Sequence, residues 1–332
     1  MRAVVITRHG VPEVLEVQER PAPTAGAGEV LIDVRAAGIN FADVMARMGL
    51  YADAPKPPCV VGYEVAGTVA AVGAGVDRFA AGDRVIAGTR FGGYASQVAP
   101  RADNCLPLPA DMSFEAGAAI PVNYGTAVAG LVQFGNLQRG EKVLVHAAAG
   151  GVGVAATQIA KRLGAEVWGT ASPGKHEAIR ALGVDHPLDY TRAGWERGLP
   201  TFDLIMDAVG GRSFRTSFAQ LRVGGRLVCF GASAVVSGEK RNLLTAIRTV
   251  LAMPRFNPMT MMSSSKAVIG LNMLALWDDR GTLGPWIAML HDMFADGTVR
   301  PVVARAFPFA EAAAAHRFIS ERRNVGKVVL VP

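Results

Sequence analysis

The sequence predicts an α/β protein in two parts, a β-rich N-terminal domain followed by a doubly wound parallel sheet. Its 332 residues are half hydrophobic and 19% charged, which provides a large globular core and suggests two domains. Short apolar runs between Gly- and Pro-rich turns fill residues 1 to about 120, a pattern typical of β-structure. Beyond Gly140, apolar runs alternate with helical segments, as in a parallel sheet with crossover helices.

In the N-terminal part, apolar or alternating runs predict strands at 2–6, 29–36, 65–72, 84–87 and 94–98. Two helices are expected next, at 112–120 and 123–134. In the second part we expect strands at 142–147, 166–170, 188–190, 202–207, 225–231 and 267–271, with helices at 154–163, 175–182 and 213–221. The tail is expected to form helices at 284–294 and 309–320 and a last strand at 327–331.

The glycine turn, residues 146–153 with the sequence HAAAGGVG, joins an apolar strand to the helix that follows. This context turns a glycine pattern into a dinucleotide-binding hypothesis. Gly150 allows the backbone to approach a pyrophosphate, and Gly153 allows the helix to pack close to the strand. The N–H groups at the start of the helix would then face the phosphates. Ala148 stands where the fingerprint has its first glycine, so an ordinary strand–helix turn is the alternative.

The end of the second strand indicates the choice of cofactor. An NAD site needs an Asp or Glu about twenty residues past the glycines to hold the ribose 2′-hydroxyl. Here Ser172 and Lys175 follow the strand, and Glu177 is the first acid. A hydroxyl and an ammonium would hold a 2′-phosphate, which favours NADP. In the alternative interpretation, Ser172 caps the next helix and Lys175 is solvated.

Charge, cysteines and histidines exclude several classes of function. The net charge is +6, but Lys and Arg are scattered, which favours small anionic ligands and argues against nucleic acid. Three widely spaced cysteines suggest a reduced, cytoplasmic setting. We expect neither a signal peptide nor a membrane span. The six histidines are far apart, and no Cys-x-x-Cys occurs, so we expect no metal site and interpret His146 as structural.

Several motifs in a fixed order give the chain a family resemblance. They are GINFAD at 38–43, Gly-Leu-Tyr at 49–51, GYEVAG at 62–67, AGDRV at 81–85, the glycine turn, and VGKVV at 325–329. The chain resembles the medium-chain dehydrogenase/reductase superfamily, and within it the zinc-free quinone oxidoreductase (zeta-crystallin) group. Asn40 and Tyr63 stand where the zinc-dependent relatives carry Cys and His ligands. Further motifs resemble the synaptic-vesicle VAT-1 homologue branch: Asn123-Tyr124, FGNL at 134–137, GTAS at 169–172, KHEA at 175–178 and KRNL at 240–243.

The resemblance implies a GroES-like catalytic domain at 1–122, completed by the tail 273–332, and a Rossmann NADP-binding domain at 123–272. The cleft between them would hold the nicotinamide and the substrate. The resemblance also implies a homodimer through the strand at 267–271. By this resemblance, the pyrophosphate would contact Ala149, Gly150, Gly151, Val152 and Gly153. The 2′-phosphate would be surrounded by Ser172, Lys175 and Tyr190. The nicotinamide side would be lined by Phe230, Gly231, Ala232, Ser233, Leu271, Asn272 and Met273. For the last group, strand-end packing is the alternative.

The catalytic residues expected from this resemblance are Asn40, Tyr51 and Thr126. NADPH carries the hydride, and a quinone or other α,β-unsaturated carbonyl accepts it without a metal because the charge spreads onto its oxygen. Asn40 and Tyr51 would hydrogen-bond that oxygen or the nicotinamide, and Thr126 would hold the carboxamide. Alternatively, Asn40 is a turn residue and Tyr51 an ordinary loop aromatic. Asp43 would support Asn40, and Glu64 would orient its neighbours.

The Met-rich segment 245–266 has no cofactor role in this scheme. Met253, Met259, Met261 and Met262 lie among prolines, and methionine-rich surfaces repack around varied partners. We interpret it as core filler with a mobile loop; the alternatives are a lid on the cleft and a partner or peripheral membrane contact. An NADPH-binding interaction or membrane-peripheral protein of the VAT-1 type, with little turnover, is therefore the alternative function.

Overall fold

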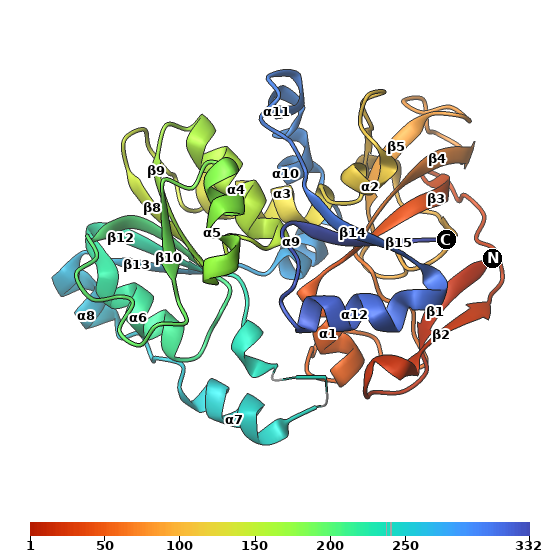
Figure 1. Cartoon of the computed structure of the whole chain (residues 1–332). Helices are drawn as coiled ribbons and strands as arrows, with labels where there is room; N and C mark the ends of the chain where they lie inside the picture. The colour runs from red at the N-terminus through yellow and green to blue at the C-terminus, as the bar shows by residue number, and fades with distance from the viewer. Residues whose placement is uncertain (237, 240) are drawn as a thin grey trace.

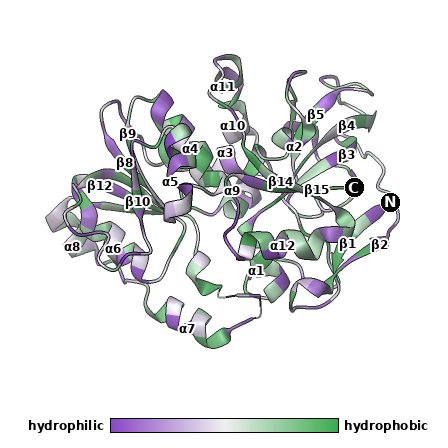
Figure 2. Ribbon diagram, viewed as in Figure 1, coloured by the Kyte–Doolittle hydropathy of each residue, from purple (hydrophilic) through white to green (hydrophobic). Residues whose placement is uncertain are grey.

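The computed structural model describes residues 1–236, 238–239 and 241–332. Lys240, one residue of the motifs behind the family resemblance, lies outside this part of the chain. Figure 1 shows two domains side by side, a β-rich domain on the right and a parallel-sheet domain on the left. Figure 2 shows hydrophobic and hydrophilic residues alternating along many of their strands.

A seven-stranded sheet forms the β-rich domain, in the order β14-β15-β3-β4-β5-β7, with β6 paired to β3. Its long central strand β3 (Val30–Ile39) pairs antiparallel with β4 (Glu64–Val72) on one side and with β15 (Lys327–Val331) on the other. The C-terminal strand β15 therefore lies inside this sheet, while the domain bounds 1–122 and 273–332 stay predictions. The other strands are β5 (Arg84–Gly88), β6 (Gln97–Val98), β7 (Cys105–Pro107), β14 (Val303–Pro308), and the separate pair β1 (Arg2–Ile6) and β2 (Leu15–Glu19).

The parallel-sheet domain has six strands in the order β10-β9-β8-β11-β12-β13, all parallel. Chain order reverses between β8 and β11, and a doubly wound sheet opens a crevice at the carboxyl ends of its strands at such a point. The doubly wound α/β prediction is confirmed. The strands are β8 (Lys142–Val145), β9 (Glu166–Ala171), β10 (His186–Asp189), β11 (Phe202–Asp207), β12 (Leu221–Cys229) and β13 (Ala267–Gly270). Their helices are α4 (Gly151–Arg162), α5 (His176–Ala181) and α6 (Arg212–Gln220).

One buried cluster crosses from one domain to the other through α3 (Pro121–Val128). It joins Ile86 of β5 to Tyr124 of α3 and Val143 of β8. The predicted boundary between residues 122 and 123 lies inside this helix, so α3 contributes to a core that both domains share. The predicted helix at 123–134 continues beyond α3 as one π-helical turn, Ala129–Gln133.

Several elements differ from the sequence prediction. β2, β7, β14 and the helices α1 (Phe41–Met48) and α9 (Met273–Arg280) were not expected. The predicted helix at 284–294 is two short helices, α10 (Gly284–Ala288) and α11 (His291–Ala295). The segment 245–266 is not an irregular loop, because it holds most of α7 (Leu243–Leu251) and all of α8 (Pro258–Ser264). The remaining helices, α2 (Phe114–Gly117) and α12 (Ala312–Ser320), fall within predicted helical segments.

Two predictions concern surfaces of the whole chain. In the described ranges, no helix combines the length and the apolar character needed to cross a bilayer.

β13 is one of the two edge strands of the parallel sheet, which leaves one row of its backbone groups available for strand pairing. The homodimer through this edge stays a prediction.

Candidate active site

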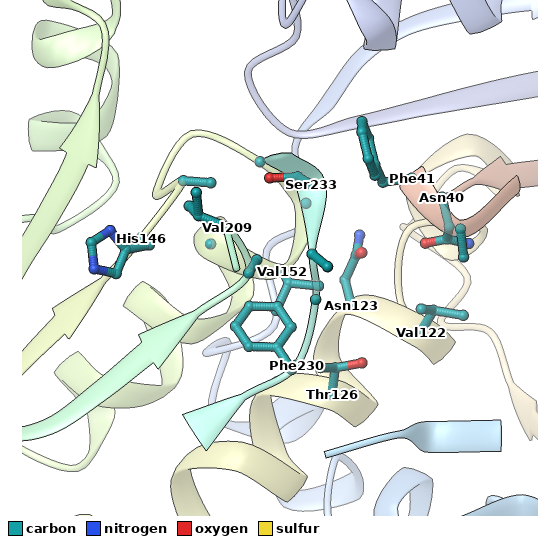
Figure 3. A pocket seen from close by; sticks show the side chains of 18 of the residues that line it. Asn40, Phe41, Val122, Asn123, Thr126, His146, Val152, Val209, Phe230 and Ser233 are labelled. Carbon is teal, nitrogen blue, oxygen red and sulfur yellow. The ribbon is translucent and has the colours of Figure 1, made fainter. Parts of the chain in front are cut away.

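A cavity of about 910 Å³ lies where the two domains meet, at the carboxyl ends of the parallel strands. Figure 3 shows Asn40 and Phe41 on one side of it, Val209 and His146 on the other, and Phe230, Val152 and Thr126 between them. All eighteen residues predicted for the site line this cavity: Asn40, Tyr51, Thr126, Ala149, Gly150, Gly151, Val152, Gly153, Ser172, Lys175, Tyr190, Phe230, Gly231, Ala232, Ser233, Leu271, Asn272 and Met273. Their individual roles stay predictions.

The glycine turn has the geometry that the sequence predicts for Gly153. A Cβ at Gly153 would lie 2.4 Å from the carbonyl oxygen of Ala147 and 2.6 Å from Cα of Ala148, so only glycine lets α4 pack so closely. Gly150 caps α4, and its amide donates to Ala147 O at 2.8 Å. Ala147 has a φ of 53°, a left-handed conformation that turns the chain sharply away from β8.

Lys175 is not a solvated surface residue. Its Nζ donates to the carbonyl oxygens of Arg322 at 2.5 Å and Asn324 at 2.7 Å. Burial, and then the charge of Arg322, lower the pKa of Lys175. Ser172 stands at the start of a 3₁₀ turn, but no side-chain cap bond is formed by it in the described structure. Ser172 and Lys175 therefore do not fill the alternative roles of cap and free surface charge.

A buried hydrogen-bonded group holds Asn40, and its central cation is Lys327. Lys327 Nζ donates to Asn40 Oδ1 at 2.6 Å and also to Glu64. Asn40 Nδ2 donates to Glu64 Oε1 at 2.9 Å. Because Lys327 only donates and Glu64 only accepts, the two fix which end of the Asn40 amide faces which partner. Glu64 also accepts from the Val122 amide at 2.8 Å, so it orients its neighbours as predicted.

Asp43 supports Asn40 from behind. Its Oδ2 accepts from the backbone N–H of Asn40 at 2.7 Å, and its Oδ1 accepts from the backbone N–H of Gly62 at 3.1 Å. Burial raises the pKa of Asp43 to about 7, against the lowering effect of these hydrogen bonds and of Lys327. Asn40 thus stands at the start of α1. Asp43 fixes its backbone N–H, and Lys327 and Glu64 fix its side-chain amide. The turn-residue interpretation of Asn40 and the catalytic one are both compatible with this geometry.

Two tyrosines of the β-rich domain border the same cavity. Burial, followed by the nearby carboxylates of Asp53 and Asp43, raises the pKa of Tyr51 to about 12, so its hydroxyl stays protonated at neutral pH. Tyr63 is buried, and burial also raises the pKa of its phenol. Tyr63 OH has no hydrogen-bond partner within the described part of the chain. Such an unpaired buried hydroxyl beside a cavity is a polar group that a ligand can satisfy.

Asn272, which we predict to lie on the nicotinamide side, links that part of the cavity to the β-rich domain. Its Oδ1 caps α9 by accepting from the Leu274 amide at 2.9 Å, and its Nδ2 donates to Asp53 Oδ2 at 3.2 Å. Phe230–Ser233 leave the end of β12 and Leu271 leaves the end of β13, so both segments reach the cavity at strand ends. Thr126 is buried on α3 nearby.

His146 belongs to a buried network in the parallel-sheet domain. Its Nε2 lies 3.0 Å from Ser217 Oγ, which donates to Asp207 Oδ2 at 2.7 Å. Burial lowers the pKa of His146, and its hydrogen bonds confirm the structural interpretation. Sequence reasoning missed this end of the cavity, which Trp195 and Arg212 also line. It also missed Lys327 and Arg322, because neither lies near a recognisable nucleotide motif.

Asn40 and Tyr63 occupy the positions at which the zinc-dependent relatives carry metal ligands, and no metal-binding cluster is found there in the described structure. In residues 1–236, 238–239 and 241–332, no three His, Cys, Asp or Glu side chains gather in a way that could hold a metal ion. Asn40 is hydrogen-bonded to Glu64 and Lys327, and Tyr63 packs against Phe91 with ring centroids 5.3 Å apart.

Two family models match the chain. The alcohol dehydrogenase GroES-like domain matches residues 26–110, and a model described as zinc-binding dehydrogenase matches residues 182–330. Among curated proteins, the human synaptic vesicle membrane protein VAT-1 homolog is 37% identical over 100% of this chain and 86% of its own length.

Solved structures extend the likeness to the whole fold. The human VAT-1 homolog-like protein has a TM-score of 0.86 at 30% identity, covering 100% of this chain and 98% of its own. The quinone oxidoreductase of Escherichia coli, solved with NADPH, has the same TM-score and identity and covers 100% of both chains. CurK enoyl reductase reaches 0.86 at 28% identity, covering 99% of this chain and 98% of its own.

The matching models, the full-length relatives and the shared two-domain architecture lead to one conclusion. This chain belongs to the medium-chain dehydrogenase/reductase family, as a quinone oxidoreductase-like member with a GroES-like domain and a six-stranded parallel nucleotide-binding domain.

Proposed function

We propose that this oxidoreductase transfers hydride from NADPH to a quinone or another α,β-unsaturated carbonyl, without zinc. The observation that carries the proposal is the position of Asn40, held by Lys327 and Glu64 at the wall of a cavity that the glycine turn also lines. The lining includes four cationic side chains, Lys175, Arg212, Arg322 and Lys327, and one carboxylate, Glu196. This excess of positive charge suits a polyanionic cofactor.

The chain's own residues would act on the acceptor carbonyl. NADPH, when bound, supplies the hydride. One N–H of Asn40 is used by Glu64, so the other can donate to the oxygen on which negative charge develops. Donors placed in advance on such an oxygen stabilise the transition state because they need no reorganisation. The protonated Tyr51 hydroxyl can donate a second hydrogen bond, or a proton, with solvent as the other proton source.

The test is NADPH oxidation across a panel of quinones, enones and alkenals, with NADH in parallel. Asn40→Ala should lower kcat by about 100-fold, the usual cost of one such donor, while the Kd for NADPH changes by less than about threefold. If the protein binds NADPH tightly and oxidises it with no member of the panel, the proposal fails. If Asn40→Ala keeps full activity, the catalytic role of Asn40 fails and its N-terminal position on α1 is its whole function.

A second candidate, an NADPH-binding protein that works by peripheral membrane contact, rests on α7 and α8. Seven large hydrophobic side chains are exposed on these two helices: Leu243, Leu244, Ile247, Val250, Leu251, Met259 and Met262. The exposed cations Arg241, Arg248 and Arg255 lie in the same segment. Exposed apolar residues beside cations suit an anionic lipid surface.

Sedimentation with vesicles that contain phosphatidylserine tests this candidate. Leu244→Glu combined with Met262→Glu should abolish sedimentation, because charge would replace two of the exposed apolar contacts. Val223→Glu is the matched control, since Val223 is 70% exposed on β12. Equal sedimentation of all three proteins, or none by the unmodified chain, would exclude membrane contact through these helices.

A further inference from the structure

A second cavity, of about 460 Å³, lies beneath α7 and borders the active-site cavity. Within the part of the chain that the structure describes, nine residues line it and all are apolar: Met45, Leu50, Ala232, Val235, Ala246, Ile247, Val250, Leu251 and Met253. Met45 and Ala232 line both cavities, and Leu50 precedes Tyr51, which lines the active site. The apolar cavity therefore adjoins the place where we expect the substrate carbonyl and the nicotinamide.

α7 covers this cavity and is only shallowly packed, with Ala246 against the core cluster of the β-rich domain. None of its residues is buried, although its sequence LLTAIRTVL is mostly apolar. In Figure 1 it stands apart, below the gap between the domains, and Figure 2 shows hydrophobic residues along it. Asn242 caps its start by accepting from the Thr245 amide at 3.0 Å, and Thr249 Oγ1 attaches the helix to the segment that follows β12 by donating to Ala234 O at 3.2 Å.

Apolar side chains on both sides of this second cavity favour a hydrocarbon as its occupant. Met45 and Leu50 come from the β-rich domain, Ala246 and Val250 from α7, and none offers a polar group. Water there would find no hydrogen-bond partner on the lining side chains, whereas a hydrocarbon would be removed from water on entering. The neighbouring active site, by contrast, offers donors to a carbonyl oxygen.

We propose that this cavity binds the hydrocarbon tail of the substrate, so that the substrates are quinones or enones with a linear alkyl chain. The inference rests on the proposed function and deepens it. The carbonyl lies near Asn40 and Tyr51, the chain leaves the active site between Met45 and Ala232, and its end lies under α7. Chain length, rather than the head group alone, then determines catalytic efficiency.

A series of 1-alken-3-ones from four to fourteen carbons, assayed with NADPH, measures this dependence. Burying one methylene is worth at most about fourfold in affinity, so kcat/KM should rise two- to fourfold per added carbon. The increase should stop once the cavity is filled. A flat dependence on chain length, with the short enones turned over, would overturn the inference and leave the proposed function standing.

Ala246→Phe provides the structural test, because a ring at this position fills the cavity from the α7 side. It should abolish the dependence on chain length while leaving kcat/KM for the four-carbon enone within about twofold. Leu244→Phe is the matched control, since Leu244 is exposed on the same helix and does not line the cavity. Loss of the dependence in both variants, or in neither, would count against the assignment.

Binding can be measured without turnover by calorimetric titration of 2-undecanone and 2-butanone into the NADP⁺-loaded protein. The long ketone should bind at least 30-fold more tightly, and Ala246→Phe should remove that difference. Equal affinities would overturn the inference even if no enone is reduced. If the long ketone binds but no member of the series is reduced with NADPH, the tail site stands and the proposed reaction fails.

Discussion

Among single residues, Lys327 connects the most distant parts of the site. It is 3% exposed, lies on β15, and contacts Asn40 and Glu64, which are 287 and 263 residues away in the sequence. A buried ion pair of this kind need not add net stability over an apolar pair, but breaking it leaves one charge uncompensated. Lys327 is therefore expected to matter through the position of Asn40 and through the burial of Glu64.

Lys327→Met should lower the free energy of unfolding by about 3–5 kcal/mol, because Glu64 would remain buried without its cation. The urea unfolding midpoint measures this loss. Glu64→Gln together with Lys327→Met should cost less than Lys327→Met alone, since no charge then stays buried. A double variant as unstable as the sum of the two single variants would show that the pair is not the source of the effect.

At the same scale, all eighteen residues predicted from the sequence lie on one cavity, and Asp43 and Glu64 were expected near Asn40, but Lys327, which also holds Asn40, was not. The glycine turn, Ser172 and Lys175 were found because each carries a local chemical signal next to a strand end. Lys327 lies in the family motif VGKVV, but nothing around it names a partner, and a lysine that opens a C-terminal apolar strand looks like a solvated charge. Its partners become visible only when β15 pairs with β3.

Among the elements, success followed the clarity of the apolar pattern rather than length, because the four-residue strands β8 and β13 were predicted and the nine-residue helix α7 was not. The parallel strands and α4 have clear patterns, and Gly153 fits the close packing of α4 against Ala147 and Ala148. α1 has eight residues and follows a strand directly at Asn40, so its start is marked by a capping interaction with Asp43 rather than by a turn. Local patterning cannot distinguish such a start from a loop.

The composition of the segment that contains α7 and α8 predicts a loop, whereas the structure has helices there. Its methionines and prolines suggested a loop, yet Pro258 occupies the first turn of α8, where proline is compatible with a helix because the first N–H has no intrahelical partner. No residue of α7 is buried. Its apolar side chains therefore do not cover a core as those of a packed helix do, and no helix is predicted here from the sequence. The mobility predicted for this segment stays a prediction.

In the whole molecule, the segment 322–327 of the tail joins three parts of the site. The carbonyls of Arg322 and Asn324 accept from Lys175, Gly326 donates to Ala149 of the glycine turn at 2.8 Å, and Lys327 holds Asn40. One segment of the β-rich domain thus contacts both regions of the parallel-sheet domain that are predicted to bind the cofactor. A bound NADPH is expected to strengthen this junction because its phosphates would lie among these residues.

This junction makes cofactor binding measurable as thermal stability. A ligand at 100 times its Kd adds about 2.7 kcal/mol to the free energy of unfolding, so NADPH should raise Tm in the unmodified chain. In Lys175→Glu that rise should largely disappear for NADPH, because a carboxylate would repel the 2′-phosphate, and persist for NADH. Lys56→Glu, the same charge change at an exposed position outside the cavity, should keep the full NADPH shift. Since Lys175→Glu also removes the bonds to Arg322 and Asn324, only the ligand-induced shift, and not Tm itself, is compared. Equal losses of the NADPH and NADH shifts would mean that Lys175 holds the tail and does not select the phosphate.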